Sequence, residues 1–300
     1  MAAATYNPSM RSTAIMAATA SLALAVWPGV PAWADGTALP GTRPLGAGGA
    51  MRAAATGDAG PMLNPSGISL VRSYTAEGGY QFGSRDSTHD ARVSLVDSTS
   101  GLDLGGALFY TFHAASPGGV SQTGHLTGAS LSFPLGDVLF IGVTGKYLHY
   151  PSAKGFTVDT GLTVRPMQFL SLAVVGYNLT NPGSSLAPQA VGGGLCLSLA
   201  TGLLLLADSV WERASKDAYN PQVTHSNAYH VMGGAEYLIK TVAVRVGGGR
   251  DGLNRNGYVS GGFSFVSGVG ALDTSVRQDI SGNRKGTFVG VSARLFVPAP

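Results

Sequence analysis

Apolar and polar residues alternate along most of the chain from about residue 72 onward, and this two-residue period predicts β-strands. The stretch 156–165 shows the pattern most clearly. One of its faces carries Phe156, Val158, Leu162 and Val164, and the other carries Thr157, Asp159, Gly161, Thr163 and Arg165. Similar stripes recur at 74–82, 102–112, 139–147, 242–246 and 288–295. The chain is therefore predicted to be all-β.

About fourteen strand-like segments follow this pattern. They begin near residues 73, 90, 102, 124, 138, 154, 168, 188, 202, 227, 241, 256, 269 and 285. Most are about 10 to 12 residues long, whereas strands of soluble domains average about 5 to 6. A tilted strand needs about 9 to 11 residues to cross a bilayer. The segments therefore have the length of membrane-spanning strands, although the count leaves twelve and sixteen strands open.

The connections between these segments alternate between short and long. The short ones are 134–137, 165–167, 200–202, 239–240 and 267–268, and the longer polar ones are 84–89, 114–123, 150–154, 178–188, 212–226, 250–255 and 278–285. This alternation is typical of an up-and-down antiparallel barrel with short periplasmic turns and longer outer loops. Because each unpaired backbone group in hydrocarbon is costly, the last strand, 285–296, is expected to pair with the first, 73–84.

The charged residues of the strands indicate which face points inward. Arg or Lys facing lipid costs about 2 to 4 kcal/mol at the membrane midplane, so the charged strand residues are expected to point into the lumen. They are Glu77, Asp103, Lys146, Asp159, Arg165, Glu236, Arg245, Asp273, Arg277 and Arg294. This balanced set of acids and bases predicts cross-strand ion pairs, which we interpret first as structural ties and second as a substrate path.

The first 34 residues have the pattern of a secretory signal peptide. Arg11 supplies a positive charge, residues 14–26 are apolar, and Ala32-Trp33-Ala34 is a small-x-small cleavage site. The apolar run is shorter than the roughly 18 residues of a spanning helix, which disfavours the alternative of a membrane anchor. The chain is therefore expected to be exported and cleaved after Ala34, and the translation start is left open between Met1 and Met10.

The composition argues against a disordered chain, a nucleic-acid-binding protein and a disulfide-stabilised domain. Only 12% of the residues are charged and 44 are glycine, but 44% are hydrophobic and recur with a clear period, which argues against disorder. Once Arg11 is removed with the signal peptide, 18 Lys and Arg remain against 16 Asp and Glu, a net charge near +2 that indicates no nucleic-acid partner. Cys196 is the single cysteine and has no disulfide partner, and its apolar neighbours predict a buried, inert thiol.

Residues 43–72 break the strand pattern, since they are rich in Gly and Ala and contain several Pro. We therefore divide the mature chain into an N-terminal hatch segment, 35–72, and a barrel, 73–300. The segment is expected to lie inside the barrel or at its periplasmic mouth. Its small-residue run, 48–50, followed by Asp58 and by Asn64-Pro65-Ser66-Gly67, resembles the start of FadL-like outer-membrane proteins, including their PorV-like branch, which usually carry Ala at the place of Ser66.

A second likeness, to the final strands of PorV-like proteins, lies in residues 244–249, 261–263 and 272–273. The resemblance implies a fourteen-stranded barrel in the bacterial outer membrane, surrounded by lipid and inserted by the barrel assembly machinery. It also implies an N-terminal hatch that contains Asp58, Asn64, Pro65 and Gly67. Two features depart from the family. The outer loops are shorter than those of a fatty-acid importer, and Phe296, the aromatic residue that assembly factors would recognise, lies four residues before the end.

The preferred functional hypothesis is a passive conduit or binding barrel for a small hydrophobic or amphipathic molecule, gated by the hatch. The alternative is a PorV-like adaptor that binds a secreted protein and passes no solute. A soluble periplasmic β-sandwich is a third possibility, and an enzymatic barrel with Ser, His and an acid on separate strands is the least favoured.

No cofactor or catalytic residue is expected. The Gly-x-Gly-x-x-Gly match at 247–252 is followed by another strand pattern rather than by the helix that a dinucleotide site needs. The six histidines lack the spacing of metal ligands, and there is no Gly-x-Ser-x-Gly motif to indicate a nucleophile.

Overall fold

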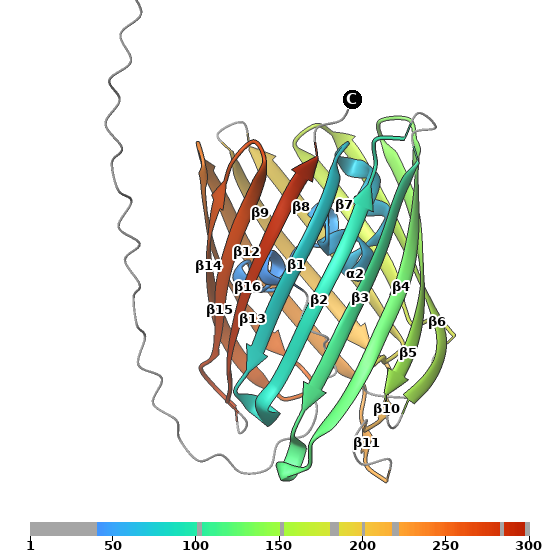
Figure 1. The fold of residues 1–300 in the computed structure, drawn as a ribbon, viewed down its shortest axis with the longest axis vertical. Coiled ribbons are helices and arrows are strands. Elements are labelled where there is room, and N and C mark those ends of the chain that lie inside the picture. Colours follow the sequence, from blue (N-terminus) through green and yellow to red (C-terminus); the bar gives the residue numbers. More distant parts are fainter. Residues whose placement is uncertain are drawn as a thin grey trace, which may run out of the picture.

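The computed structural model describes residues 41–100, 104–150, 153–180, 186–199, 202–217, 222–282 and 285–297. The predicted signal peptide (1–34), the start of the predicted hatch segment (35–40) and Asp103 lie outside the described residues. Within the described residues, one closed antiparallel β-barrel surrounds a short N-terminal segment (Figure 1). Among these residues, no helix is long and apolar enough to cross a membrane.

The barrel wall consists of fourteen strands, as the alternating pattern predicts. They are β1 (Tyr74–Gly83), β2 (Thr88–Asp97), β3 (Gly105–Ala115), β4 (Gln122–Leu135), β5 (Leu139–Tyr150), β6 (Ala153–Met167), β7 (Leu170–Tyr177), β8 (Ala190–Leu199), β9 (Leu203–Glu212), β12 (Ala228–Ile239), β13 (Val242–Asp251), β14 (Asn256–Val266), β15 (Gly270–Asp279) and β16 (Thr287–Val297). Each strand pairs with its neighbours along the chain, and β1 pairs with β16 to close the sheet. The predicted fourteen-stranded antiparallel barrel is confirmed, and the predicted alternatives of a β-sandwich and of twelve or sixteen strands are wrong.

The outer surface of the barrel is apolar, and the inner surface is polar. On β6, the outward-facing Phe156 is 60% exposed and Leu162 is 40% exposed, whereas Thr157 and Asp159 between them are almost completely buried. This division follows from the strand period, which sends successive side chains to opposite faces. Because hydrocarbon solvates the apolar side and offers no partner to charges, the surface fits a barrel that crosses a membrane.

The connections fall into two groups, one at each end of the barrel. Tight turns join β4 to β5, β12 to β13 and β14 to β15 at the turn end, where β1 begins and β16 finishes. The loop end carries the short helices η3 (Arg85–Ser87) and η4 (Pro117–Gly119), and a small hairpin of β10 (Ser215–Lys216) and β11 (Thr224–His225) projects from it (Figure 1). The expected loop at 150–154 is wrong, because β5 and β6 continue to Tyr150 and from Ala153, which pair with each other.

Residues 41–72, which we call the N-terminal segment, lie inside the barrel (Figure 1, blue). They form four short helices: α1 (Thr42–Gly46), η1 (Arg52–Ala54), α2 (Ala59–Leu63) and η2 (Pro65–Leu70). Helices this short are unstable alone, so contacts with the barrel wall must hold them. Met51, Ala53 and Ala59 pack in one buried cluster with wall residues Ala173 and Cys196, and Cys196 is a free, buried thiol.

The apolar outer surface generates a prediction about membrane depth. Leu162→Arg places a cation on the outer face near the middle of β6, and we expect it to lower the free energy of unfolding by about 2 to 4 kcal/mol. The matched control is Val191→Arg at the loop end of β8, where the cost should be only about 0 to 1 kcal/mol. Urea unfolding in lipid vesicles measures both, and equal costs would contradict the placement of the bilayer.

Candidate functional site

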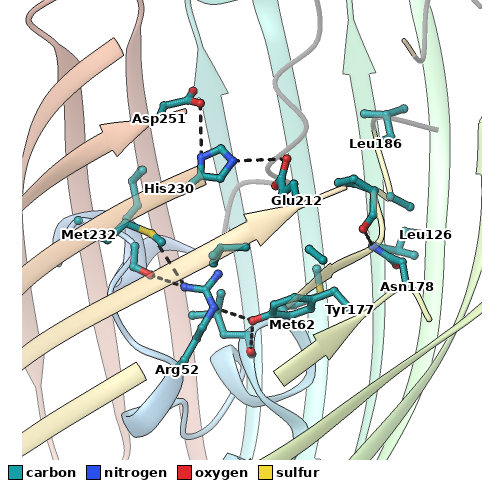
Figure 2. Close-up of a pocket in the computed structure, with 18 of the residues that line it drawn as sticks. Arg52, Met62, Leu126, Tyr177, Asn178, Leu186, Glu212, His230, Met232 and Asp251 are labelled. Carbon is teal, nitrogen blue, oxygen red and sulfur yellow. Dashed lines mark hydrogen bonds and ion pairs between the residues drawn. The ribbon is translucent and has the colours of Figure 1, made fainter. Parts of the chain in front are cut away.

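A cavity of about 150 Å³ lies inside the barrel, between the N-terminal segment and the loop end. Gly48, Gly49, Arg52 and Met62 of the segment line one side of it. Leu45 and Leu63 of the segment also line it. The remaining lining comes from the loop-end halves of the strands and from Asn178 and residues 186–188 of the connection between β7 and β8. Figure 2 shows these side chains converging from several strands on the same space. The closed sheet therefore brings together residues far apart in the sequence.

One part of the cavity is apolar. Leu126 of β4 and Leu148 of β5 point inward and are almost fully buried. They pack with Met62 of the segment and with Leu186 and Ala187 of the connection between β7 and β8. Leu45, Leu63, Val210 and Met232 extend the apolar lining. This wall offers dispersion contacts and hydrophobic burial to an apolar ligand.

The opposite part of the cavity is polar, and its centre is His230 of β12. Its Nε2 atom lies 3.4 Å from Glu212 Oε2, and its Nδ1 atom lies 3.5 Å from Asp251 Oδ1 (Figure 2). Beside this group, the guanidinium carbon of Arg277 lies 3.8 Å from the centre of the Tyr258 ring. Among the residues that the structure describes, no group of three or more His, Cys, Asp or Glu is placed to hold a metal ion.

Arg52 joins the N-terminal segment to the wall at the floor of the cavity. Its Nη1 atom lies 3.0 Å from Asp208 Oδ2, its Nε donates to the Tyr177 hydroxyl at 2.8 Å, and its backbone N–H donates to Asp208 at 2.9 Å. The Tyr177 hydroxyl donates in turn to the Leu63 carbonyl (Figure 2). Burial lowers the pKa of Arg52, but Tyr177 and Asp208 more than offset this effect, so the pKa is raised and the guanidinium stays charged.

A second set of ties runs across the wall strands β12, β13, β15, β16 and β1, and we call it the lumenal ion-pair chain. Its members, in order of contact, are Arg43, Glu236, Arg245, Asp273, Arg294 and Glu77, with Asp58 as a third partner of Arg294. Arg43 and Asp58 belong to the N-terminal segment, so the chain begins and ends on it. Arg43 Nη2 lies 2.7 Å from Glu236 Oε1, and Arg294 Nη2 lies 3.6 Å from Asp58 Oδ1.

The Asn-Pro-Ser-Gly motif fixes the last part of the segment to the wall. Asn64 is completely buried, and its Nδ2 donates to the Arg52 carbonyl and to Thr163 Oγ1, both at 2.8 Å. Its Oδ1 accepts from the backbone N–H and the hydroxyl of Ser66, and the Ser66 hydroxyl lies 2.8 Å from that of Thr163. The hydroxyl of Ser66 therefore adds two contacts, with Asn64 and with Thr163. Gly67 is required because a Cβ there would lie 2.2 Å from the Ala55 carbonyl oxygen.

Glycines in the wall leave room for the same motif. A Cβ on Gly142 of β5 would lie 2.2 Å from the backbone of the motif at Pro65 and Ser66, and one on Gly161 of β6 would lie 2.1 Å from Asn64 Oδ1. Real Cβ atoms do not approach this closely. Part of the high glycine content therefore lets the segment approach the strands.

The structure places the predicted lumenal charges on the inward face, except Asp103, which is outside the described residues. Five of them, Glu77, Glu236, Arg245, Asp273 and Arg294, belong to the lumenal ion-pair chain. Lys146 lines the cavity and lies 2.7 Å from Asp159. Arg277 lies 3.2 Å from Asp279. Arg165 stands apart at the turn end, where its Nη2 lies 3.4 Å from the Leu70 carbonyl oxygen.

Sequence reasoning missed several charged or polar residues that line the cavity or hold the segment in place. They are Arg43, Arg52, Asp208, Glu212, His230 and Asp251. For Asp208, the sequence did indicate an inward-facing charge. The residue lies in the apolar strand 203–212, on the face opposite Leu205 and Ala207. Glu212 and Asp251 lie at strand ends that were assigned to loops. The sequence around Arg52 gave no indication that Asp208 is its partner. A segment without a repeating pattern does not show which of its residues face the wall.

A second hollow, of about 780 Å³, lies at the turn end. Ser69, Leu70 and Arg72 of the segment line it, together with the turns around Pro134 and Pro166. It shares no lining residue with the loop-end cavity. In sequence, Asn64, Ser66 and Ile68 lie between Leu63 of the cavity lining and Ser69 of the hollow, and they are at most 1% exposed.

Comparison with solved structures finds the same barrel in transport proteins. A FadL homologue of Pseudomonas aeruginosa aligns with a TM-score of 0.64 and 11% identity over 89% of this chain and 99% of that one. The toluene transporter TbuX of Ralstonia pickettii gives 0.62 and 12% over 86% and 98%, and the monoaromatic hydrocarbon channel CymD gives 0.61 and 13% over 86% and 96%. No protein-family model and no curated protein matches the sequence.

At this identity the comparisons show the fold alone. The FadL-like part of the resemblance is confirmed at that level, whereas the PorV-like branch stays a prediction.

The contacts of Arg52 generate a prediction about the stability of the segment. Asp208→Ala leaves a buried guanidinium without its carboxylate, a loss that costs about 3 to 5 kcal/mol in buried pairs. We expect the backbone amides of residues 49–56 to exchange at least about tenfold faster, as measured by hydrogen–deuterium exchange with mass spectrometry. The control Asp159→Ala removes the partner of Lys146 and should leave these amides unchanged. In the double variant Arg52→Met with Asp208→Leu, these amides should exchange more slowly than in Asp208→Ala, because no buried charge is left without a partner. Equal exchange rates in all variants would contradict a stabilising role for the Arg52–Asp208 pair.

The close approach at Gly161 generates a second prediction. Gly161→Ala drives a methyl group into the Asn64 amide, and we expect the free energy of unfolding to fall by about 1 to 3 kcal/mol. Gly78→Ala is the control, because a Cβ there meets no atom within 4 Å. Limited proteolysis should cut the N-terminal segment faster in Gly161→Ala only. A segment equally protected in both variants would show that the contact is unimportant.

Proposed function

We propose that this chain is an outer-membrane barrel that binds a small hydrophobic or amphipathic molecule in the loop-end cavity and conducts it inward. The observation that carries the proposal is the cavity itself, a largely apolar space of about 150 Å³ at the loop end and above the N-terminal segment. A passive barrel whose first strand begins and whose last strand finishes at the turn end has its loop end outside. The cavity is therefore the first space that a solute meets.

The size and lining of the cavity indicate the ligand class. A dry cavity of about 150 Å³ is large enough to bind benzene. Leu126, Leu148 and Met62 would contact the ring, while His230 with its two carboxylates would accommodate a polar substituent. The structures of similar fold that are named as a toluene transporter and a monoaromatic hydrocarbon channel support the same class.

Conduction further requires that the N-terminal segment act as a hatch. The two hollows share no lining residue, and the motif residues that lie between their linings in sequence are buried. A molecule bound in the cavity would therefore reach the turn end only after part of the segment moves. The ties of Arg52 and of the lumenal ion-pair chain would set the free energy of that movement. We propose no catalytic step and no cofactor.

Binding is tested by filling the cavity. Leu126→Trp projects a larger side chain into it, and we expect the dissociation constant for fluorobenzene, measured by fluorine NMR on the protein in nanodiscs, to rise by about tenfold or more. Leu131→Trp, on the outer face of the same strand, is the control and should bind as the unmodified chain does. If Leu126→Trp binds fluorobenzene equally well, the cavity is not the binding site.

Gating is tested separately by toluene flux into proteoliposomes. Asp208→Ala should speed flux because it weakens the tie of the segment, whereas Asp159→Ala should not. Equal flux in the two variants would contradict a hatch without affecting the binding result. The PorV-like adaptor predicts another outcome: no flux in any variant and a stoichiometric secreted protein in pull-downs from native outer membranes.

A further inference from the structure

Three of the six histidines lie together on the outer face of the barrel, on neighbouring strands close to the loop end. With adjacent tyrosines and a lysine they form what we call the rim patch. Its members are Tyr80 of β1, His89 of β2, Tyr110 of β3, His125 of β4, His149 of β5 and Lys154 of β6. This grouping lies outside the barrel and takes no part in the cavity.

The strand period places these side chains outward. Asp90, Leu126 and Leu148, each next in sequence to a patch histidine, are buried on the inner face. The register joins three members of the patch in one row, because His125 is the direct cross-strand partner of His149, and His149 is that of Lys154. Lys154 and His149 are exposed, and His125 and His89 are half-buried.

Contacts within the patch orient the imidazole rings. The Tyr110 hydroxyl lies 2.7 Å from His125 Nδ1, and Tyr80 makes the same contact with His89. The His125 and His149 rings lie 6.3 Å apart, centre to centre. A neutral imidazole whose Nδ1 accepts a tyrosine proton carries its own proton on Nε2. In that tautomer, Tyr80 and Tyr110 orient the Nε2–H donors of His89 and His125 on the outer surface of the barrel.

The local charge favours an anion. Lys154 supplies an exposed cation at the end of the row. The carboxylates at the same end of the neighbouring strands point inward, where Asp90 lies 2.7 Å from His113 and Asp159 lies 2.7 Å from Lys146. Next to the row, Tyr147 and Phe156 are 50% and 60% exposed, a surface suited to acyl chains. The patch thus combines donors and one cation with an apolar surface directed toward the membrane interior.

We propose that the rim patch binds a phosphate group of the phosphorylated glycolipid of the outer leaflet. The imidazoles of His125 and His149, with Lys154 on the next strand, would donate to the phosphate oxygens, since charge-assisted bonds to phosphate are the strong ones. Tyr147 and Phe156 would contact the acyl chains. The proposal rests on the membrane placement of the barrel with its loop end outside, and it is independent of what the cavity binds.

The opposite side of the barrel provides the comparison. At the same level its outward side chains include Val191, Trp211, Tyr229 and Arg250, and none of those that the structure describes there is a histidine. Arg250 is exposed and carries a cation without the tyrosine-oriented donors. If only electrostatic attraction held the phosphate, Arg250 would bind it as well as Lys154 does. If the oriented imidazoles are also needed, Arg250 would bind it less well.

The test is native mass spectrometry of the full barrel titrated with bisphosphorylated lipid A. We expect His125→Gln, His149→Gln and Lys154→Gln, combined in one variant, to weaken lipid A binding by about tenfold or more, and Arg250→Gln to change it by less than about twofold. Dephosphorylated lipid A should bind the unmodified chain as weakly as lipid A binds the triple variant. Retained heat-modifiable migration on gels shows that each variant is folded.

Three results would overturn the proposal. They are equal binding of lipid A to the triple variant and the unmodified chain, equal binding of phosphorylated and dephosphorylated lipid A, and an Arg250→Gln loss as large as that of the triple variant. Phosphatidylglycerol serves as the competing source of phosphate. If it displaces lipid A at equal concentration, the patch does not select the outer-leaflet glycolipid.

Discussion

The pairing of backbone groups in hydrocarbon is the constraint on which the rest of this structure depends. An N–H or C=O without a partner costs several kcal/mol where there is no water, so a sheet that crosses a membrane has to close. Closure through β1 and β16 removes both edges. It also separates two surfaces completely, and the strand period then sends apolar side chains to lipid and polar ones to the lumen. Both the interior of this barrel and its outer rim are consequences of that separation.

The filled interior creates a second requirement, because buried charges need partners. The wall strands supply Glu236, Arg245, Asp273 and Arg294, and the N-terminal segment adds Arg43 and Asp58 to the same chain of contacts. Buried ion pairs are weak evidence for stability, but removing one partner is costly. The wall and the segment therefore specify each other's position. Glycines at 142 and 161 contribute by leaving space rather than by making contacts.

Sequence reasoning could predict the barrel because the same two-residue alternation recurs in about fourteen strands. An error in the bounds of one strand therefore does not change the predicted fold. The loop at 150–154 was wrong because a polar, Pro-containing stretch is compatible with both a loop and a tight turn. The candidate site was largely beyond prediction. Asp208, Tyr177 and Arg52 meet across 156 residues of sequence, and only the closed sheet sets which strands face one another. Asn64 was recognisable from its motif, yet its partner Thr163 was not.

The ties that hold the N-terminal segment are unevenly distributed, so its parts differ in how much free energy their displacement costs. Between Arg43 and Asp58 the segment has one charged residue, Arg52. Gly48, Gly49 and Gly57 adopt positive φ on either side of it, and a Cβ at Gly57 would meet no atom within 4 Å. A displacement confined to residues 47–57 breaks the Arg52 ties, including the Asn64 bond to the Arg52 carbonyl, and the packing of small side chains. Withdrawal of the whole segment also breaks the Arg43 and Asp58 ion pairs and the rest of the Asn64 network. Because each buried pair is costly to break, displacing residues 47–57 costs less free energy than withdrawing the whole segment.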